Sequence, residues 1–517
     1  MTNHDFTDKL DLASLRLGGS VIGASDDFFA EKENLLLAHP AVWKEHAYTD
    51  KGKWMDGWES RRKRTPGYTS GPGTEWNDWA IIRLGVPGVL SGAVVDTSFF
   101  RGNFPESCSI EGTGAPIDAP LETLIDPKTE WVEALPRTSL EGNAQNRFAI
   151  ACPYAFTHVR LRIFPDGGVA RLRLHGDVAP DWTRIGHARG EIDLAAAEHG
   201  GDVLLASDMF FGERRNLVMP GRAVNMSDGW ETRRRRGPGS DWAILRLAAP
   251  GTISRLEIDT NHFKGNFPDT CKVEACFAPG VNAEELAKPT AEWRELLGTT
   301  KLQAHTRHYF ERELADLDRV THVRLNVYPD GGVSRLRVFG SLDVDARRTL
   351  GVARLDRFTP KEANAALKAC AASPRWVDAM LESRPFATTR HLFDEADRTW
   401  RKLGHDDFRE AMRAHPRIGE REASAQREAG EKAWSRKEQS GMSAATEEQK
   451  REMRELNAAY EAKFGFVYIV CATGKTGDEL IEIAKNRLKN DPAAEIAIAG
   501  EELFKIATLR LEKLLDL

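Results

Sequence analysis

The sequence predicts a multidomain protein in which two tandem all-β repeats, each a jelly roll or β-sandwich, are followed by an all-α helical domain. Three observations lead to this prediction. At 517 residues the chain is too long for a single hydrophobic core. Its first two-thirds contain a duplicated sequence, and beyond about residue 348 the hydrophobic pattern becomes helical. We place the three domains at residues 10–180, 185–342 and 350–517.

The duplication is visible as sequence segments that recur in the same order. DWAIIRLGVPG at residues 78–88 returns as DWAILRLAAPG at residues 241–251. HVRLRIFPDGG at residues 158–168 returns as HVRLNVYPDGG at residues 322–332. Because order and spacing both persist, we expect each copy to fold as one structural unit.

Strands are expected in each copy where apolar and polar residues alternate, as at residues 80–86, 92–99 and 158–164 of the first copy. The Pro-Asp-Gly-Gly segments at residues 165–168 and 329–332 predict hairpin turns, because proline fixes φ and glycine permits positive φ. Many short strands with frequent glycine and proline are typical of a sandwich or jelly roll.

Helices are expected in the last third of the chain. Thr359 and Glu362 predict a capping box at the start of one helix. Residues 491–515 also suit a long helix. The charged segment at residues 341–356 has no clear hydrophobic period, so we interpret it as the boundary between two independently folded pieces.

The composition is typical of a soluble globular protein, with 41% hydrophobic and 29% charged residues. The net charge of -6 gives no general attraction to nucleic acid or anionic lipid. No stretch approaches the roughly 18 apolar residues of a membrane span, and no signal peptide is visible. The six cysteines contain no C-x-x-C pair, so we expect no disulfide framework and a cytoplasmic location.

Three motifs carry the chemistry of the helical part: AHPRIG (residues 414–419), WSRKEQS (residues 434–440) and FVYIVCATGKT (residues 466–476). Their order and type resemble the 2-oxo-4-hydroxy-4-carboxy-5-ureidoimidazoline (OHCU) decarboxylases over nearly all of residues 350–517. The resemblance implies decarboxylation of OHCU to (S)-allantoin in an all-α domain.

The acid–base groups of this reaction are expected within those motifs. His415 suits a role at the hydroxyl-bearing carbon, because imidazole titrates near neutrality. Glu438 suits delivery of the proton to the carbanion, or anchoring of the ureido groups together with Gln439. We expect no metal or organic cofactor for this reaction, since the segment shows no metal-ligand spacing. The predicted substrate-binding residues, several of them by resemblance alone, are Pro416, Ser435, Gln439, Val467, Tyr468, Ile469, Val470 and Arg487.

Structural alternatives exist for several of these residues. Ser435 and Glu438 fit a capping box, and His415 fits the C-terminal cap of a helix. Arg487 fits a solvated charge on an amphipathic helix. The presence of all three motifs in family order favours the functional interpretation.

The repeats share the motifs A-S-D-x-F-F, D-G-W-E-[ST]-R-R, D-W-A-I-[IL]-R-L and G-N-F-P. In this combination they resemble the allantoicases, which consist of two such repeats, over about residues 10–340. The resemblance implies hydrolysis of allantoate to ureidoglycolate and urea on jelly-roll domains. The alternative is an OHCU decarboxylase joined to a non-catalytic jelly-roll tandem that binds a ligand. Ligand-binding modules of that kind expose aromatic side chains as a binding surface.

Allantoate has one carboxylate and two ureido arms, so its site needs guanidinium groups and hydrogen-bond acceptors. Each copy offers both types in its D-G-W-E-[ST]-R-R loop and in an aspartate near an early strand. His262, which we set against Ser98 of the first copy, either makes the second copy catalytic or is a surface residue. The candidates are Asp26, Glu59, Arg61, Asp208, Glu231, Arg233 and His262.

The expected partners are small ureide substrates. The arginine runs at residues 61–64 and 233–236 raise nucleic-acid binding as an alternative, but each is short and embedded in a net-acidic chain. We therefore expect neither a nucleic-acid nor a membrane partner. No clustered histidine or cysteine spacing marks a metal site in the repeats, and their need for a divalent ion is left open. A homo-oligomer is compatible with the sequence.

Overall fold

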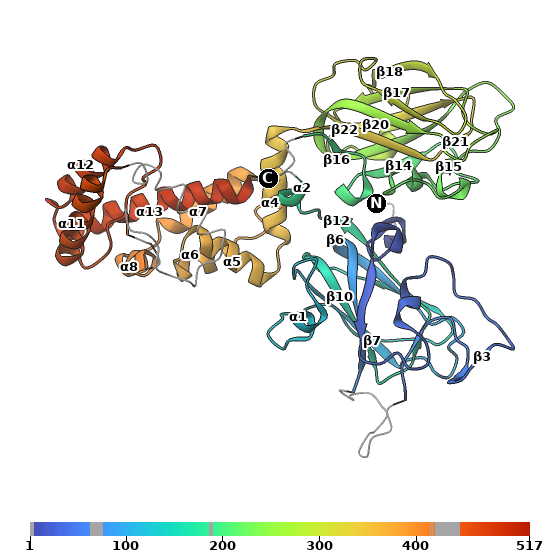
Figure 1. Cartoon of the computed structure of the whole chain (residues 1–517), viewed down its shortest axis with the longest axis horizontal. Coiled ribbons are helices and arrows are strands. Elements are labelled where there is room, and N and C mark those ends of the chain that lie inside the picture. Colours follow the sequence, from blue (N-terminus) through green and yellow to red (C-terminus); the bar gives the residue numbers. More distant parts are fainter. Residues whose placement is uncertain are drawn as a thin grey trace. The chain divides into compact units, whose positions relative to one another are not determined.

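The chain divides into two compact units, Met1–Ala346 and Arg347–Leu517. The first contains two β-sheet repeats and the second is helical (Figure 1), so the predicted fold class is confirmed. The computed structural model describes residues 5–62, 76–185, 190–413, 415, 417–418 and 445–516.

The first repeat is organised around one long strand, β6. Its strands are β1 (Leu10–Asp11), β2 (Ser20–Ala24), β3 (Tyr48–Thr49), β4 (Gly52–Lys53), β5 (Trp58–Glu59), β6 (Asp78–Asp96), β7 (Ser107–Thr113), β8 (Val132–Ser139), β9 (Gln145–Ala149), β10 (Ala155–Phe164), β11 (Gly168–Val169) and β12 (Arg171–Val178). Its helical turns are η1 (Phe6–Asp8), η2 (Leu15–Leu17), η3 (Lys32–Leu36), α1 (Leu121–Ile125) and α2 (Trp182–Ile185). The main sheet has the order β1-β12-β6-β10-β7-β8, and β2 and β9 also pair with β6.

The second repeat has the same topology. Its strands are β13 (Ile192–Asp193), β14 (Asp202–Ala206), β15 (Trp230–Glu231), β16 (Asp241–Asp259), β17 (Thr270–Cys276), β18 (Arg294–Lys301), β19 (Arg307–Phe310), β20 (Val320–Tyr328), β21 (Gly332–Val333) and β22 (Arg335–Leu342). Its helical turns are η4 (Ala197–His199), η5 (Arg214–Val218), η6 (Met226–Asp228) and α3 (Ala283–Leu286). The order β13-β22-β16-β20-β17-β18, with β14 and β19 on β16, matches the first sheet strand for strand.

One strand prediction is wrong in its boundaries. Residues 80–86 and 92–99, expected as separate strands, contribute to the single strand β6, which has 19 residues. Along β10 the pairing passes directly from Gly88 to Arg83, so the residues between them, including Pro87, have no partner in β10. Proline is tolerated in a strand at such an irregularity because no ladder hydrogen bond from its nitrogen is needed.

The hairpin prediction for the Pro-Asp-Gly-Gly segments is also wrong. The strands that flank the first segment, β10 and β12, lie on opposite sides of β6 and do not pair with each other. The positive φ expected of glycine is present, at +137° for Gly167 and +134° for Gly331. The next residues form β11, which pairs with β5, so each segment leads the chain past the loop that carries a candidate glutamate.

A close backbone contact fixes the place of β5 and its glutamate. A Cβ atom at Gly168 would lie 1.9 Å from Phe100 Cε1, so only glycine lets β11 approach this fully buried ring. On the partner strand Trp58 is also fully buried, and its Nε1 donates to Asp26 O at 2.8 Å. Glu59 therefore follows a firmly anchored tryptophan.

The helical unit contains, within its described residues, α4 (Val344–Arg357), α5 (Pro360–Cys370), α6 (Pro374–Glu382), α7 (Thr389–Trp400), α8 (His405–Arg413), α11 (Glu447–Phe464), α12 (Gly477–Arg487) and α13 (Pro492–Leu515). The capping box of Thr359 and Glu362 at the start of α5 is confirmed. No helix in the described part of the chain is both long and apolar enough to span a membrane.

The interpretation of residues 341–356 as a segment without helical period is wrong. Most of it belongs to α4, in which Val352 and Leu355 are buried in the core of the helical unit. These two positions are three residues apart and lie on one helix face. Because the residues around them are charged, this short apolar stripe does not stand out in the hydrophobic pattern of the sequence.

Candidate functional sites

Arg487, a predicted substrate ligand, ends α12 and is only 7% exposed. Its Nε donates to Glu495 Oε1 at 2.7 Å, and its Nη1 donates to Ile469 O at 2.5 Å. The Tyr460 hydroxyl accepts a bond of 3.2 Å from Nη2 and donates to Glu495. Burial raises the pKa of Tyr460, so its hydroxyl stays protonated as this donor. The solvated-charge alternative for Arg487 is therefore wrong.

The predicted substrate-binding backbone lies beside this arginine. Tyr468, Ile469 and Val470 are buried, and Val467 is half-buried. The Arg487 guanidinium carbon is 5.1 Å from the centre of the Tyr468 ring. The Tyr468 hydroxyl is buried and receives or donates no hydrogen bond among the described residues. The structure thus brings Arg487 together with the segment that the sequence assigns to the substrate.

His415 follows the last turn of α8. Its backbone N–H donates to Met412 O at 3.0 Å, and its ring Nδ1 lies 3.3 Å from Ala411 O. These contacts fit the helix C-terminal cap that the sequence offers as an alternative, and they do not test a catalytic role. The other predicted residues of this site lie outside the described residues; they are Pro416, Ser435, Glu438 and Gln439.

In the repeats, two of the predicted site residues form an ion pair with each other. Arg61 Nε donates to Asp26 Oδ2 at 2.6 Å, and its backbone N–H donates to Asp26 Oδ1 at 2.9 Å. In the second repeat, Arg233 makes the same two bonds to Asp208, at 3.0 and 2.7 Å. Burial raises the pKa of both aspartates, but the hydrogen bonds from the arginines outweigh it and leave both values below the ordinary range.

The predicted Glu59 is also held by a residue of the G-N-F-P motif. Asn103 Nδ2 donates to Glu59 Oε1 at 2.7 Å, and in the second repeat Asn266 Nδ2 makes the same bond to Glu231 at 2.5 Å. Burial raises the pKa of Glu59, partly offset by the bond from Asn103 and the charge of Arg62. Glu59 is thus a carboxylate of raised pKa held in one orientation, which suits proton transfer near neutral pH.

Glu59 and Asn103 line a cavity of about 510 Å³, a size typical of small-molecule sites. Among the described lining residues Glu59 is the one acidic side chain. Asp26 and Arg61 are not part of this lining. The remaining lining residues are Phe29, Trp43, Lys51, Gly52, Lys53, Met55, Phe99, Arg101 and Gly102.

Three cations around this cavity were not singled out from the sequence. Arg101 is exposed and makes no hydrogen bond or ion pair with any described residue. Lys53 Nζ donates to Lys44 O at 2.9 Å, and Lys51 Nζ lies 5.1 Å from the centre of a phenylalanine ring. The signal for both lysines is present in the sequence, because they belong to a segment that the second repeat lacks.

The alignment of His262 with Ser98 is wrong. His262 has φ +71°, and Phe99 has φ +70°, so these two residues occupy the same left-handed position. The backbone N–H of His262 donates to His305 Nδ1, just as that of Phe99 donates to Asn143 Oδ1, each at 2.8 Å. The His262 ring is half-buried rather than at the surface, and its Nε2 lies 2.9 Å from a backbone carbonyl.

The histidines that occur at the same position in both copies have structural roles. His158 and His322 are buried in β10 and β20, and burial lowers the pKa of each to about 4. Each ring Nδ1 lies about 3 Å from the hydroxyl of the preceding threonine. No group of three or more histidine, cysteine, aspartate or glutamate side chains that could hold a metal occurs in the described part of the chain.

The chain is similar to known proteins along almost its whole length. Residues 10–179 and 192–343 match the allantoicase repeat, and residues 356–512 match the OHCU decarboxylase family. A probable allantoicase of Burkholderia mallei is 50% identical over 341 residues, covering 66% of this chain and 96% of the relative. A probable allantoicase of Photobacterium profundum is 47% identical over 336 residues, covering 65% and 97%.

The fold of the repeats is similar to that of a solved structure. The crystal structure of allantoicase from Saccharomyces cerevisiae is 35% identical, with a TM-score of 0.52. The similarity covers 64% of this chain and 93% of that one. Because each relative is covered almost completely, the repeats correspond to a whole protein of this kind and the helical unit is an addition to it.

Proposed function

The chain belongs to the allantoicase family and carries an OHCU decarboxylase domain behind its two repeats, and we propose that it performs the two reactions in separate units. The observation that carries the proposal is the agreement of boundaries. The allantoicase match ends at residue 343 and the decarboxylase match begins at residue 356, on either side of the division at Ala346. The repeats would hydrolyse allantoate, and the helical unit would convert OHCU to (S)-allantoin.

In the helical unit we assign His415 to acid–base chemistry and Glu438 to proton delivery, without metal or organic cofactor. Arg487 supports substrate binding at this site because it lies against the segment of residues 467–470. A guanidinium group carries five N–H donors, and Nη1 of Arg487 has one beyond its bond to Ile469 O. The imidazole of His415 has the right intrinsic acidity for the task.

The two reactions are not consecutive. Decarboxylation yields allantoin, whereas the repeats use allantoate, so a ring-opening hydrolase must act between them. We therefore propose shared expression rather than direct transfer of substrate. A reducing cytoplasm is the proposed location, in keeping with six free cysteine thiols.

The test uses the purified full-length protein with allantoate and, separately, freshly made OHCU, and identifies products by mass spectrometry. Urea should appear with the first substrate and allantoin with the second, and exhaustive chelation should not reduce allantoin formation. His415→Asn should slow allantoin formation by about 10²- to 10⁴-fold and leave urea release unchanged. His405→Asn, at an exposed position in the helix that precedes His415, is the matched control.

Retention of the wild-type decarboxylation rate by His415→Asn would reject the assignment of the helical unit. Glu438→Gln separates two further outcomes. Racemic allantoin or a slow reaction supports proton delivery, whereas normal turnover with a small loss of stability supports a capping box. If the protein does not cleave allantoate but binds sugars from a test panel, the repeats are a ligand-binding tandem.

A further inference from the structure

The two repeats differ most in the segment that precedes the D-G-W-E loop. Twenty-one residues lie between Asn34 and Asp56 of the first repeat, but eleven lie between Asn216 and Asp228 of the second. The longer segment forms the β3–β4 hairpin and supplies Trp43 and both lysines of the cavity lining. One wall of the cavity is therefore built from residues that the second repeat does not have.

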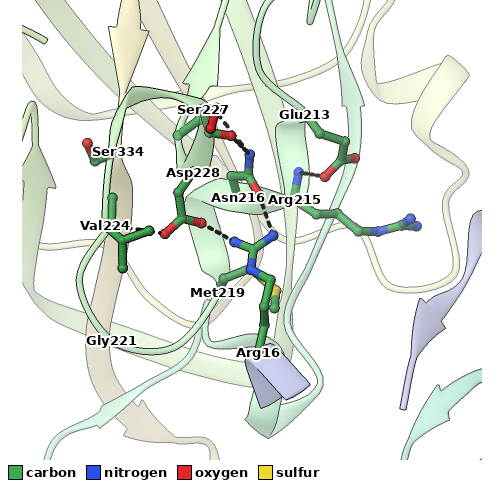
Figure 2. Close-up of polar contacts among 12 residues, drawn as sticks. Arg16, Glu213, Arg215, Asn216, Met219, Gly221, Val224, Ser227, Asp228 and Ser334 are labelled. Carbon is green, nitrogen blue, oxygen red and sulfur yellow. Dashed lines mark hydrogen bonds and ion pairs between the residues drawn. The ribbon is translucent and has the colours of Figure 1, made fainter. Parts of the chain in front are cut away.

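Figure 2 shows that the short segment of the second repeat is tied down at both ends. Arg16, from the first repeat, donates to Asn216 Oδ1 at 2.9 Å and forms an ion pair with Asp228. Asp228 Oδ2 also accepts a bond of 3.1 Å from the backbone N–H of Val224. The same carboxylate pairs with Arg335 at 3.0 Å. Asp56 of the first repeat also binds a backbone N–H and an arginine, so among these contacts only those of Arg16 are particular to the second segment.

The short segment also contacts the residues that correspond to the cavity. Met226 Sδ lies 3.7 Å from Asn266 Nδ2, the same nitrogen that binds Glu231. His262, at the position of the cavity-lining phenylalanine, lies with Nε2 2.9 Å from Ala223 O. In the second repeat, therefore, Met226 of the short segment contacts the asparagine of the glutamate–asparagine pair, and the His262 ring contacts the backbone of that segment.

We propose that allantoate is hydrolysed in the cavity of the first repeat, with Glu59 as general base and Arg101 as ligand of the substrate carboxylate, and that the second repeat is a non-catalytic copy. This inference rests on the proposed allantoicase activity and specifies its site. Arg101 is chosen because its guanidinium has no partner among the described residues, whereas Arg61 is bound to Asp26 and Arg62 Nη2 to Gly102 O.

The geometry around Glu59 suits activation of water. Asn103 holds Oε1, and Oε2 accepts no hydrogen bond from the described residues. Glu59 takes a proton from water while the water oxygen bonds to the carbon that carries the two ureido groups. The bond from this carbon to one ureido nitrogen breaks, and the proton passes from Glu59 to that nitrogen. Urea leaves, and ureidoglycolate keeps the new hydroxyl group.

The decisive experiment compares Glu59→Gln with Glu231→Gln in the full-length protein. Glutamine Oε1 still accepts the bond from Asn103 or Asn266. Both variants should therefore keep the melting temperature of the wild-type protein. Urea release from allantoate should fall by about 10²- to 10⁴-fold in Glu59→Gln and stay within about twofold in Glu231→Gln. A second pair of variants compares Arg101→Met with Lys264→Met. Arg101→Met should raise the KM for allantoate by about 10- to 150-fold, and Lys264→Met should leave it unchanged.

Each outcome decides the question. Equal losses in both glutamate variants would mean that both repeats contribute to the reaction, and a loss confined to Glu231→Gln would place it in the second repeat. Either result overturns this inference, while urea release by the wild-type protein still supports the proposed allantoicase activity. A Glu59→Gln protein with wild-type kcat would also overturn the proposal. If the wild-type protein releases no urea from allantoate, the proposed activity fails and this inference fails with it. The acid limb of kcat/KM in the wild type supplies an independent readout, because it should vanish in Glu59→Gln.

Discussion

The two repeats of this chain share one scaffold but differ in what the scaffold carries. Both contain an aspartate that pairs with a buried arginine, Asp56 with Arg171 and Asp228 with Arg335, at 2.9 and 3.0 Å. Both also hold a glutamate by the asparagine of the G-N-F-P motif. The segment before the D-G-W-E loop has ten residues more in the first repeat than in the second, and it is this longer segment that builds one wall of the cavity.

Most repeated motifs belong to the scaffold, whereas the proposed site combines the repeated Glu59–Asn103 pair with residues that the second repeat lacks or replaces. The Asp26–Arg61 pair returns as Asp208–Arg233 with nearly the same geometry. Arg101 has the shorter Lys264 as its counterpart, and Trp43 has none. A duplicated chain needs two stable sheets but a single working site, so only one copy has to keep the residues that contact a substrate.

The largest expected effect tests the shared scaffold. Asp56→Ala and Asp228→Ala should each cost about 3–5 kcal/mol of unfolding free energy, because an arginine is left buried without its carboxylate. Asp228→Ala should cost more unfolding free energy than Asp56→Ala, since Asp228 also binds Arg16. Calorimetry of the β-sheet unit measures both. Asp177→Ala, which breaks an exposed pair with a lysine, should cost less than about 1 kcal/mol.

A smaller cost for Asp228→Ala than for the exposed control would break the comparison. It would show that the second repeat does not depend on this buried pair. A large loss in Asp56→Ala alone would mean that the two copies have diverged in their scaffold as well as in their loops.

The second prediction concerns the pH dependence of stability, which should be the same for both repeats. His158 and His322 have pKa values lowered by burial from 6.5 to about 4, so the unfolded chain binds protons that the folded chain excludes. Their contribution to stability is therefore complete above pH 6.5 and is lost as pH falls toward 4. Each histidine should account for about 2 kcal/mol between pH 7.5 and 5.

Melting temperatures across this pH range check the prediction. His158→Asn and His322→Asn should each flatten the acid slope, and the double variant should flatten it further. An unchanged slope in either single variant would show that this histidine is protonated in the folded protein, and the two repeats would differ in their interiors.

The smallest expected effect separates the two interpretations of the arginine loops. If Arg61 or Arg233 held the substrate carboxylate, its replacement by alanine would raise KM by about 10- to 150-fold. Because each binds an aspartate of its own repeat, we expect similar losses of about 0.2–1 kcal/mol in stability and little change in KM for both. Steady-state kinetics of urea release decides, and a large KM effect in one variant would move the site to that loop.

Local features of the fold were predictable because they depend on neighbours in sequence. Thr359 with Glu362 closes a capping box within one turn, and Gly167 takes the positive φ that its motif requires. The helical pattern of α4 was missed because, among its described residues, only two large apolar side chains, Val352 and Leu355, belong to the core cluster. A pattern of that length is too weak to separate from a charged linker.

The duplication, the change from β-sheet to helix, the two families and the residue types available for ureide chemistry all follow from the sequence. The partners that those residues take follow from the folded structure. Arg61 binds Asp26 and Glu59 binds Asn103 across 35 and 44 positions of the chain, which no motif spans, and Arg487 binds Glu495 on the next helix. The physical reason is that charges and hydrogen-bonding groups are satisfied by whatever lies within about 3 Å, and chain topology sets those neighbours.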